Sequence, residues 1–338
     1  HSYQRSSDEY FNDPDLSINS HHRVKVSGIK FNGHQKLNDH IEFNGVIDLK
    51  KESIRSSDVG DRNRKTIATG IQATFKFVDR LNIQPGYRTD ILDDFIENTY
   101  DLTSSLNLST LGNLTMSFGT GFHAPTFNDL YWVSDSYSEG NPDLKIEHNQ
   151  YRIVRWENNF ESMTNVSLEY RRRYSDNLIT WSSNENYIWK PKNIDKSERK
   201  NMIMSVFIPM ISPGLSISGH VTRTVAIDIN TQKTLQHVPK SSANIFINYK
   251  KKDLSIECQG HYTGERPYQE LDDNWEPVDI TLNGFFDIDI GLHHLFPIQT
   301  HQLTLDLIIQ NILNQNTDFF PDYPGPKRRI KLGIELIL

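Results

Sequence analysis

Apolar and polar residues alternate with a period of two along most of this chain. Strict alternation gives a β-strand one apolar face and one polar face. No segment offers a comparable helical period with caps. The pattern therefore predicts an all-β, antiparallel protein. The clearest alternating rows cover residues 67–77, 81–87, 100–108, 114–118, 166–170, 202–208, 215–225, 243–249, 286–292, 303–309 and 330–338.

The lengths of these rows favour a transmembrane β-barrel over a soluble β-protein. Strands of soluble proteins average ~5–6 residues, whereas most rows here run for about ten residues, the length of a membrane-spanning strand. Ten residues rising ~3.3 Å each and tilted by ~45° span roughly 25 Å, the height of an outer-membrane apolar band. Short links also alternate with long polar ones, as in such barrels. The expected long links are residues 51–64, 91–98, 123–148, 175–198, 226–240, 265–281 and 313–327.

Counting the rows gives about fifteen strands. Bacterial barrels made of a single chain have an even number of strands, with both chain ends on the short-turn side. With Leu338 on that side, the first strand, at about residues 24–31, runs from the loop side. Residues 1–22 are then expected to be the tail of a loop, and the N-terminal strands of a larger barrel are expected to be absent from this chain.

The amino-acid composition excludes several classes of protein. Hydrophobic residues make up 36% of the chain and the mean hydropathy is −0.58. The longest apolar stretches fall far short of the ~20 residues of a transmembrane helix, although a β-barrel is not subject to that criterion. The net charge of −7 argues against nucleic acid as a partner, because nucleic-acid binders usually carry a basic domain. The single cysteine, Cys258, excludes an intrachain disulfide.

One segment stands apart from the alternation. The run Gly-Phe-His-Ala-Pro-Thr-Phe-Asn-Asp-Leu-Tyr-Trp occupies residues 121–132, and Gly-Asn-Pro-Asp-Leu-Lys-Ile-Glu follows at residues 140–147. Gly119 and Gly121 interrupt a strand where a side chain would crowd a neighbour, and Pro125 ends its hydrogen-bond ladder. Residues 141–143 predict a tight turn. Phe122, Phe127, Tyr131 and Trp132 are expected to form an aromatic girdle at a membrane interface.

These two runs resemble the signature loop of TonB-dependent outer-membrane receptors, in particular the branch of the cobalamin receptors. Residues 187–195, 311–315 and 323–328 also resemble segments of that family, so the resemblance covers residues 119–338. It implies that residues 1–338 are the C-terminal part of a 22-stranded barrel in the bacterial outer membrane. The family's plug domain and TonB box are absent from this chain. Leu338 stands where such barrels commonly end in Phe.

The resemblance implies a transporter and not an enzyme. Such a receptor takes up a scarce, large nutrient, here cobalamin or a ferric siderophore with cobalamin the first choice. Its implied partners are the TonB complex, engaged through the plug, and the lipids of the outer membrane. Two alternatives remain open: a plugless passive porin or structural barrel, and a soluble all-β binding module.

Aromatic residues of the long links are the candidate ligand-binding residues. They either stack on a bulky ligand or anchor the membrane interface, and the sequence leaves both readings open. Catalytic motifs, a cofactor site and a metal site are not predicted, because neighbouring histidines on a strand face opposite sides and Asp93-Asp94 and Asp272-Asp273 are typical of solvated loops. The candidates are Trp132, Tyr137, Trp181, Tyr187, Trp189 and Trp275.

Overall fold

The computed structural model describes residues 2–13, 18–77, 80–93, 95–160, 163–183, 188–272, 277–298, 301–318 and 325–337. They form one antiparallel sheet of sixteen strands, whose neighbours follow the order of the chain, and the separate β14–β15 hairpin. Within the described residues β1 and β18 are the two edges of this sheet. The strands are β1 (Ser2–Asp13), β2 (Ile18–Asn38), β3 (Ile41–Ser56), β4 (Gly60–Phe77), β5 (Leu81–Leu92), β6 (Phe95–Asn107), β7 (Asn113–His123), β8 (Glu147–Asn159), β9 (Asn165–Ser183), β10 (Trp189–Ser212), β11 (Leu215–Asp228), β12 (Ser241–Lys251), β13 (Leu254–Thr263), β14 (Arg266–Leu271), β15 (Pro277–Leu282), β16 (Phe285–Ile298), β17 (His301–Gln310) and β18 (Arg329–Ile337).

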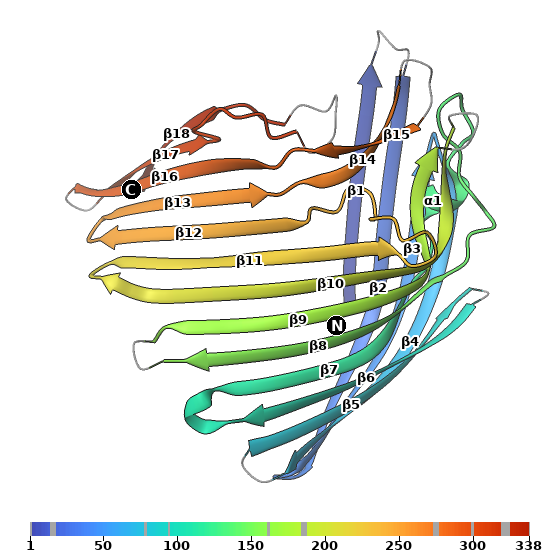
Figure 1. The fold of residues 1–338 in the computed structure, drawn as a ribbon, viewed down its shortest axis with the longest axis horizontal. Helices are drawn as coiled ribbons and strands as arrows, with labels where there is room; N and C mark the ends of the chain where they lie inside the picture. The colour runs from blue at the N-terminus through green and yellow to red at the C-terminus, as the bar shows by residue number, and fades with distance from the viewer. Residues whose placement is uncertain are drawn as a thin grey trace.

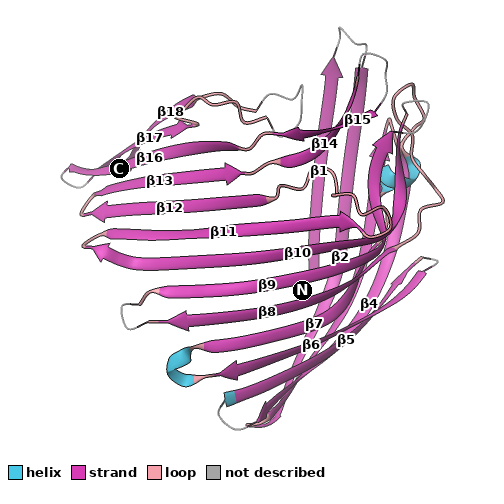
Figure 2. Ribbon diagram, viewed as in Figure 1, coloured by secondary structure: helices cyan, strands magenta, loops and turns pink. Residues whose placement is uncertain are grey.

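The sheet is strongly curved, and its two ends differ. The first strands run at a steep angle to β8–β13 (Figure 1). One end of the sheet, at the left of β7–β13 in Figure 2, carries short turns, including the single turn of 3-10 helix η2 (Ser109–Leu111). The other end carries longer connections and the only α-helix among the described residues, α1 (Phe127–Tyr131). We call these the turn end and the loop end.

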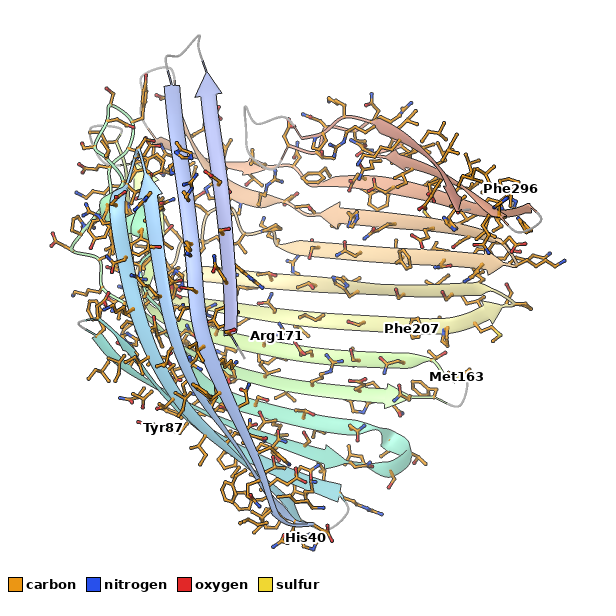
Figure 3. The ribbon with its side chains drawn as sticks, turned by 180° about the vertical axis from the view of Figure 1, so that it is seen from behind. His40, Tyr87, Met163, Arg171, Phe207 and Phe296 are labelled. Atoms are coloured by element: carbon orange, nitrogen blue, oxygen red, sulfur yellow. The ribbon has the colours of Figure 1, made fainter. Side chains whose placement is uncertain are left out.

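Side chains alternate between the two faces of the sheet, as the period-two rows predict (Figure 3). Cross-strand register places Val154 opposite Tyr170, and Tyr170 opposite Met202. These three side chains are exposed by 42%, 39% and 65% on the convex, outer face. The inner face carries polar and charged side chains, such as those of Arg155, Glu157 and Glu169. An apolar outer face and a polar inner face confirm the all-β, antiparallel prediction.

Two sequence-based expectations are wrong. Residues 1–22 are not the tail of a loop, because Ser2–Asp13 forms β1 and pairs along its length with β2. Four expected long links, residues 51–64, 91–98, 175–198 and 265–281, consist mostly of paired strand. In the first three links strict alternation of apolar and polar residues breaks down near the loop end while the backbone ladder continues: residues 51–64 are mostly polar, whereas Ile91, Leu92, Phe95 and Ile96 place apolar side chains on both faces. The main sheet accordingly has sixteen strands, where the rows gave about fifteen.

The helical content is small. Within the described part of the chain, no helix combines the length and the apolar character needed to cross a membrane.

Candidate functional site at the loop end

The connection between β7 and β8, residues 124–146, leaves the sheet where the sequence predicts. β7 ends at His123, two residues before Pro125. A Cβ atom on Gly119 would lie 2.5 Å from the Tyr151 Oη and 2.9 Å from the carbonyl oxygen of Tyr100. Only glycine leaves room for this Tyr151 hydroxyl, so the expected crowding at Gly119 is confirmed.

Helix α1 begins with a capping box. Thr126 Oγ1 accepts a hydrogen bond from the Asp129 N–H (3.1 Å), and Asp129 Oδ2 accepts one from the Thr126 N–H (2.8 Å). This reciprocal pair satisfies two backbone donors that the first helical turn leaves open. A single turn of helix is thereby fixed without a hydrophobic core of its own.

Asp129 also ties the loop to a distant strand. The Nε1–H of Trp181 in β9 donates to Asp129 Oδ1 at 2.8 Å. The Asn141 N–H donates to the Asp129 carbonyl oxygen at 2.7 Å. Only 8% of Asp129 is exposed. Asp129 therefore joins the two parts of the loop through its backbone carbonyl and ties the loop to β9 through its buried carboxylate.

Polar contacts to a distant strand also hold the second half of the loop, residues 140–146. Asn141 Oδ1 accepts from the Asp143 N–H (3.1 Å), which confirms the predicted turn. The Asn141 side-chain amide donates to the Pro191 carbonyl (2.9 Å), and Asn193 exchanges hydrogen bonds with the backbone of Lys145. Gly140 lies against α1, where a Cβ atom would be 2.6 Å from the backbone nitrogen of Trp132.

Two of the four aromatic residues expected to form a girdle at the membrane interface, Phe127 and Tyr131, lie against arginines of β4 instead. The guanidinium of Arg62 lies 4.3 Å from the ring centroid of Tyr131, and that of Arg64 lies 5.1 Å from the ring centroid of Phe127. Arg64 Nη2 also donates to the carbonyl of Pro125 at 2.7 Å. The loop is thus packed between β4 on one side and β9–β10 on the other.

The structure describes four of the six candidate ligand-binding residues and brings them to the same end of the sheet. Trp132 stacks on His22 with ring centroids 6.4 Å apart. The Trp189 N–H donates to the Tyr137 carbonyl at 2.7 Å, and the Tyr137 side chain is 78% exposed. Trp181 is fixed by Asp129 as described above. Tyr187 and Trp275 lie outside the described residues.

Trp181 and Trp189 line a hollow of about 390 Å³ at the top of β9 and β10. The connection between β11 and β12, residues 229–240, closes its other side. Lys192, Arg199 and Lys233 contribute cations to the lining, and Asp228 contributes a carboxylate. Two aromatic faces beside an excess of cations suit a bulky ligand that carries planar groups and negative charge.

The β11–β12 connection is itself anchored. Leu235 donates to the Ala226 carbonyl, and His237 donates through its backbone N–H to the Pro267 carbonyl, both at 2.9 Å. Burial, assisted by the charge of Arg266, lowers the pKa of His237 and so favours its neutral ring. Sequence analysis did not single out Lys192, Arg199 or His237, because they come together only when strands far apart in the chain pair.

The connection between β7 and β8 also contains a carboxylate, that of Asp135, which accepts hydrogen bonds from two backbone N–H groups of the same connection. Asp135 Oδ1 accepts from the N–H groups of Tyr137 and Ser138, both at 2.7 Å. The hydrogen bond from the Tyr137 N–H is the main cause that holds the pKa of Asp135 below its ordinary value, and that from Ser138 adds to it. Elsewhere in the described ranges no group of three or more His, Cys, Asp or Glu side chains is placed to hold a metal ion.

Comparison with known families decides what kind of protein carries this architecture. A family model described as "TonB dependent receptor-like, beta-barrel" matches residues 1–312. The chain belongs to the TonB-dependent receptor family. That family consists of receptors and transporters rather than enzymes.

Two relatives of the chain are named vitamin B12 transporters. A vitamin B12 transporter BtuB of Photobacterium profundum is 28% identical over 210 residues, which cover 57% of this chain and 32% of that protein. A vitamin B12 transporter BtuB of Vibrio vulnificus is 21% identical over 334 residues, covering 91% of this chain and 49% of that protein. This TonB-dependent receptor chain therefore spans at most about half the length of either relative.

Solved structures of the family share the fold. The siderophore receptor PirA from Acinetobacter baumannii superposes with a TM-score of 0.75 at 14% identity, covering 96% of this chain and 56% of PirA. The FrpB iron transporter from Neisseria meningitidis gives 0.75 at 12% identity, covering 99% and 59%. Identities this low establish the likeness of fold alone.

Proposed function

We propose that residues 1–338 contribute a β-barrel domain to an outer-membrane receptor that takes up cobalamin, with a ferric siderophore as the second choice of ligand. The match to the TonB-dependent receptor family over residues 1–312 carries this proposal. In the proposed orientation the loop end faces the outside of the cell, the turn end faces the periplasm, and the apolar outer face contacts lipid. Uptake is driven by the TonB complex.

The lining of the hollow beside Trp181 and Trp189 supports a ligand with planar and anionic groups, and its volume of about 390 Å³ suits one part of a large ligand. Cobalamin presents a flat macrocycle and an anionic phosphodiester, which match the aromatic faces and the cations of the lining. Ferric siderophores with catecholate groups are also aromatic and anionic, so the hollow supports both. Cobalamin comes first because two relatives bear the name vitamin B12 transporter.

Complementation tests the proposal. The full-length gene is expressed in a bacterial strain that lacks its own cobalamin and enterobactin receptors, and uptake of labelled cyanocobalamin and ferric enterobactin is measured with and without functional TonB. We expect uptake of cyanocobalamin only when TonB is present. Uptake of neither ligand contradicts the ligand assignment, and TonB-independent entry of both identifies a passive pore instead.

A further inference from the structure

Three cations stand directly opposite one another on the outer face of β8, β9 and β10. Arg152 pairs with Arg172 in the cross-strand register, and Arg172 pairs with Lys200. We call these three residues the cation row. Neighbouring strands lie ~4.8 Å apart, so the row spans about 10 Å. Like charges placed directly opposite each other destabilise a sheet unless something between them compensates.

The cation row lies at the border of the apolar surface. One step toward the turn end, the same face carries Val154, Tyr170 and Met202, which are again paired across the three strands. All three are among the exposed large apolar side chains. A molecule that contacts the row from outside therefore meets an apolar surface directly beside it.

The outer face offers few compensating carboxylates. Glu198 bonds Arg172 at 2.5 Å and Lys200 at 2.8 Å, and its side chain is only 8% exposed. Arg152 lies 5.9 Å from the ring centroid of Phe118 and, among the described residues, has no carboxylate partner. Arg223 of β11, opposite Met202, likewise has none in the described part of the chain. Four cations against one carboxylate leave an excess of three positive charges.

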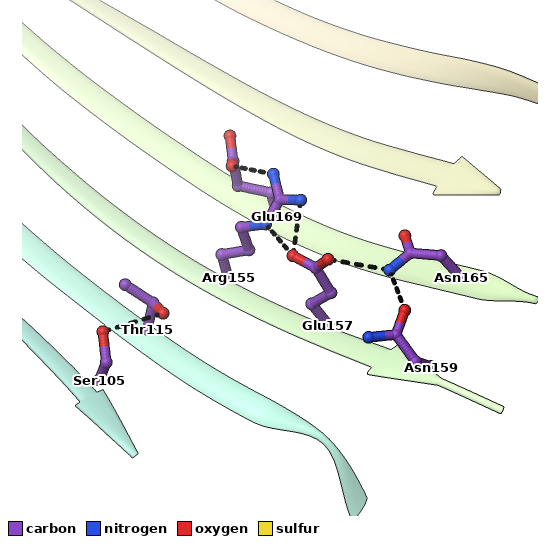
Figure 4. Close-up of polar contacts among 7 residues, drawn as sticks. All are labelled: Ser105, Thr115, Arg155, Glu157, Asn159, Asn165 and Glu169. Carbon is purple, nitrogen blue, oxygen red and sulfur yellow. Dashed lines mark hydrogen bonds and ion pairs between the residues drawn. The ribbon is translucent and has the colours of Figure 1, made fainter. Parts of the chain in front are cut away.

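The inner face of the same strands shows the opposite arrangement. Arg155 bonds Glu157 at 2.8 Å and Glu169 at 3.5 Å (Figure 4). Arg171 also bonds Glu169, and Arg173 bonds Glu147 at 2.8 Å. Each of these three arginines thus has a carboxylate from its own or a neighbouring strand. Arg199 of β10, which lies opposite Arg173 on this face, forms no ion pair with a carboxylate of the described residues. On the inner face three carboxylates therefore accompany four arginines, whereas on the outer face one carboxylate accompanies four cations.

We propose that the cation row binds the phosphate of a phosphorylated lipid in the membrane leaflet on the loop side. The phosphate accepts hydrogen bonds from Arg152, Arg172 and Lys200, and the acyl chains lie on the apolar surface beside Tyr170 and Met202. Glu198 holds Arg172 and Lys200 in position. This inference rests on the proposed outer-membrane location but not on the transported ligand. A free anion fits the charge of the row but leaves the adjoining apolar surface unexplained.

Lipid binding to the purified full-length protein tests the inference. The protein in neutral detergent is titrated with bisphosphorylated lipid A, with dephosphorylated lipid A and with inorganic phosphate, and bound lipid is counted by native mass spectrometry. We expect wild-type protein to bind the phosphorylated lipid. In the triple variant Arg152→Gln/Arg172→Gln/Lys200→Gln its affinity falls on the order of 100-fold, because each basic side chain beside an anionic headgroup contributes several-fold to binding.

A charge-matched variant controls for the loss of net positive charge. Lys145→Gln/Lys252→Gln/Lys331→Gln removes three exposed cations that lie away from the row and is expected to bind as wild type does. Equal wild-type affinity for phosphorylated and dephosphorylated lipid overturns the inference, even if the triple variant does not fold. Saturation by inorganic phosphate alone overturns the lipid as occupant. Cell fractionation, which is independent of the lipid titration, tests the proposed outer-membrane location itself.

Discussion

The two ends of the sheet are stabilised by different kinds of contact. At the turn end, short connections close on their own backbone: the Leu108 N–H donates to the Gly112 carbonyl, and the Phe160 N–H donates to the Thr164 carbonyl. At the loop end, contacts join residues about fifty positions apart, such as Trp181 to Asp129 and Asn141 to Pro191. The short turns therefore close locally, with a few contacts between neighbouring turns such as that of Trp156 Nε1–H to the Leu111 carbonyl, whereas long-range polar contacts fix the fold of the long loop itself.

The largest effect on the local stability of the loop is expected for Asp129→Ala. The substitution leaves the Thr126 N–H and the Trp181 Nε1–H without their buried acceptor, and each unsatisfied donor costs ~1–3 kcal/mol. The local stability of the loop should fall by about 3 kcal/mol. Hydrogen exchange of the Asn141 amide should accelerate on the order of 100-fold, while the turn at Gly112 is unchanged.

Asp143→Ala is the matched control for that substitution. It removes a carboxylate from the same loop, but Asp143 is exposed and only its backbone N–H contacts Asn141. Exchange at Asn141 should stay within about threefold of wild type, as for most surface substitutions. Equal acceleration in both variants would show that the loop is not held by Asp129.

The next largest effect is expected for Gly140→Ala. The added Cβ atom would lie 2.6 Å from the Trp132 nitrogen and 2.8 Å from the Tyr131 nitrogen, and neither backbone atom can move without shifting α1. Overpacking of this kind costs ~1–3 kcal/mol. Hydrogen exchange should accelerate throughout α1. In the control, Gly33→Ala, the new methyl group meets nothing within 4 Å, and α1 should exchange as in the wild type.

The contrast between the ends also explains how far the sequence could predict this structure. Period-two alternation is local, so it located strands such as β4, with Ile67 and Ile71 on one face. It failed for β1, whose residues are polar on both faces. Thr126 and Asp129 have the three-residue spacing of a capping box, which is a local signal, but no helix was predicted from it. The bond from Trp181 to Asp129 has no local signal, because it exists only once β9 lies beside the loop.

A moderate effect on ligand affinity is expected for Trp189→Ala. The indole lines the hollow, whereas the hydrogen bonds of Trp189 to Tyr137 and Glu139 use only its backbone and survive the substitution. Loss of one aromatic contact costs ~1–3 kcal/mol, so the Kd for cyanocobalamin should rise at least about tenfold. Fluorescence titration of the purified protein measures it. Trp156→Ala, at the turn end, should leave the Kd unchanged, and an equal loss there would refute the assignment of the hollow.

The smallest effect concerns pH. The Asp135 carboxylate accepts from the Tyr137 and Ser138 N–H groups, which lower its pKa, so its contribution to stability is complete above the unfolded value of ~3.9 and is lost as the pH falls through the folded pKa. Acidification from pH 4 downward should therefore accelerate exchange at Ser138 beyond the intrinsic change. Asp135→Asn should remove this dependence.

The turn at the opposite end of the sheet provides the control. The Gly112 N–H donates to the Ser109 carbonyl, which does not titrate, so the exchange rate of the Gly112 amide, corrected for the intrinsic change, should stay constant over the same pH range. A parallel change at Gly112 would mean that acid loosens the whole sheet rather than this carboxylate cap.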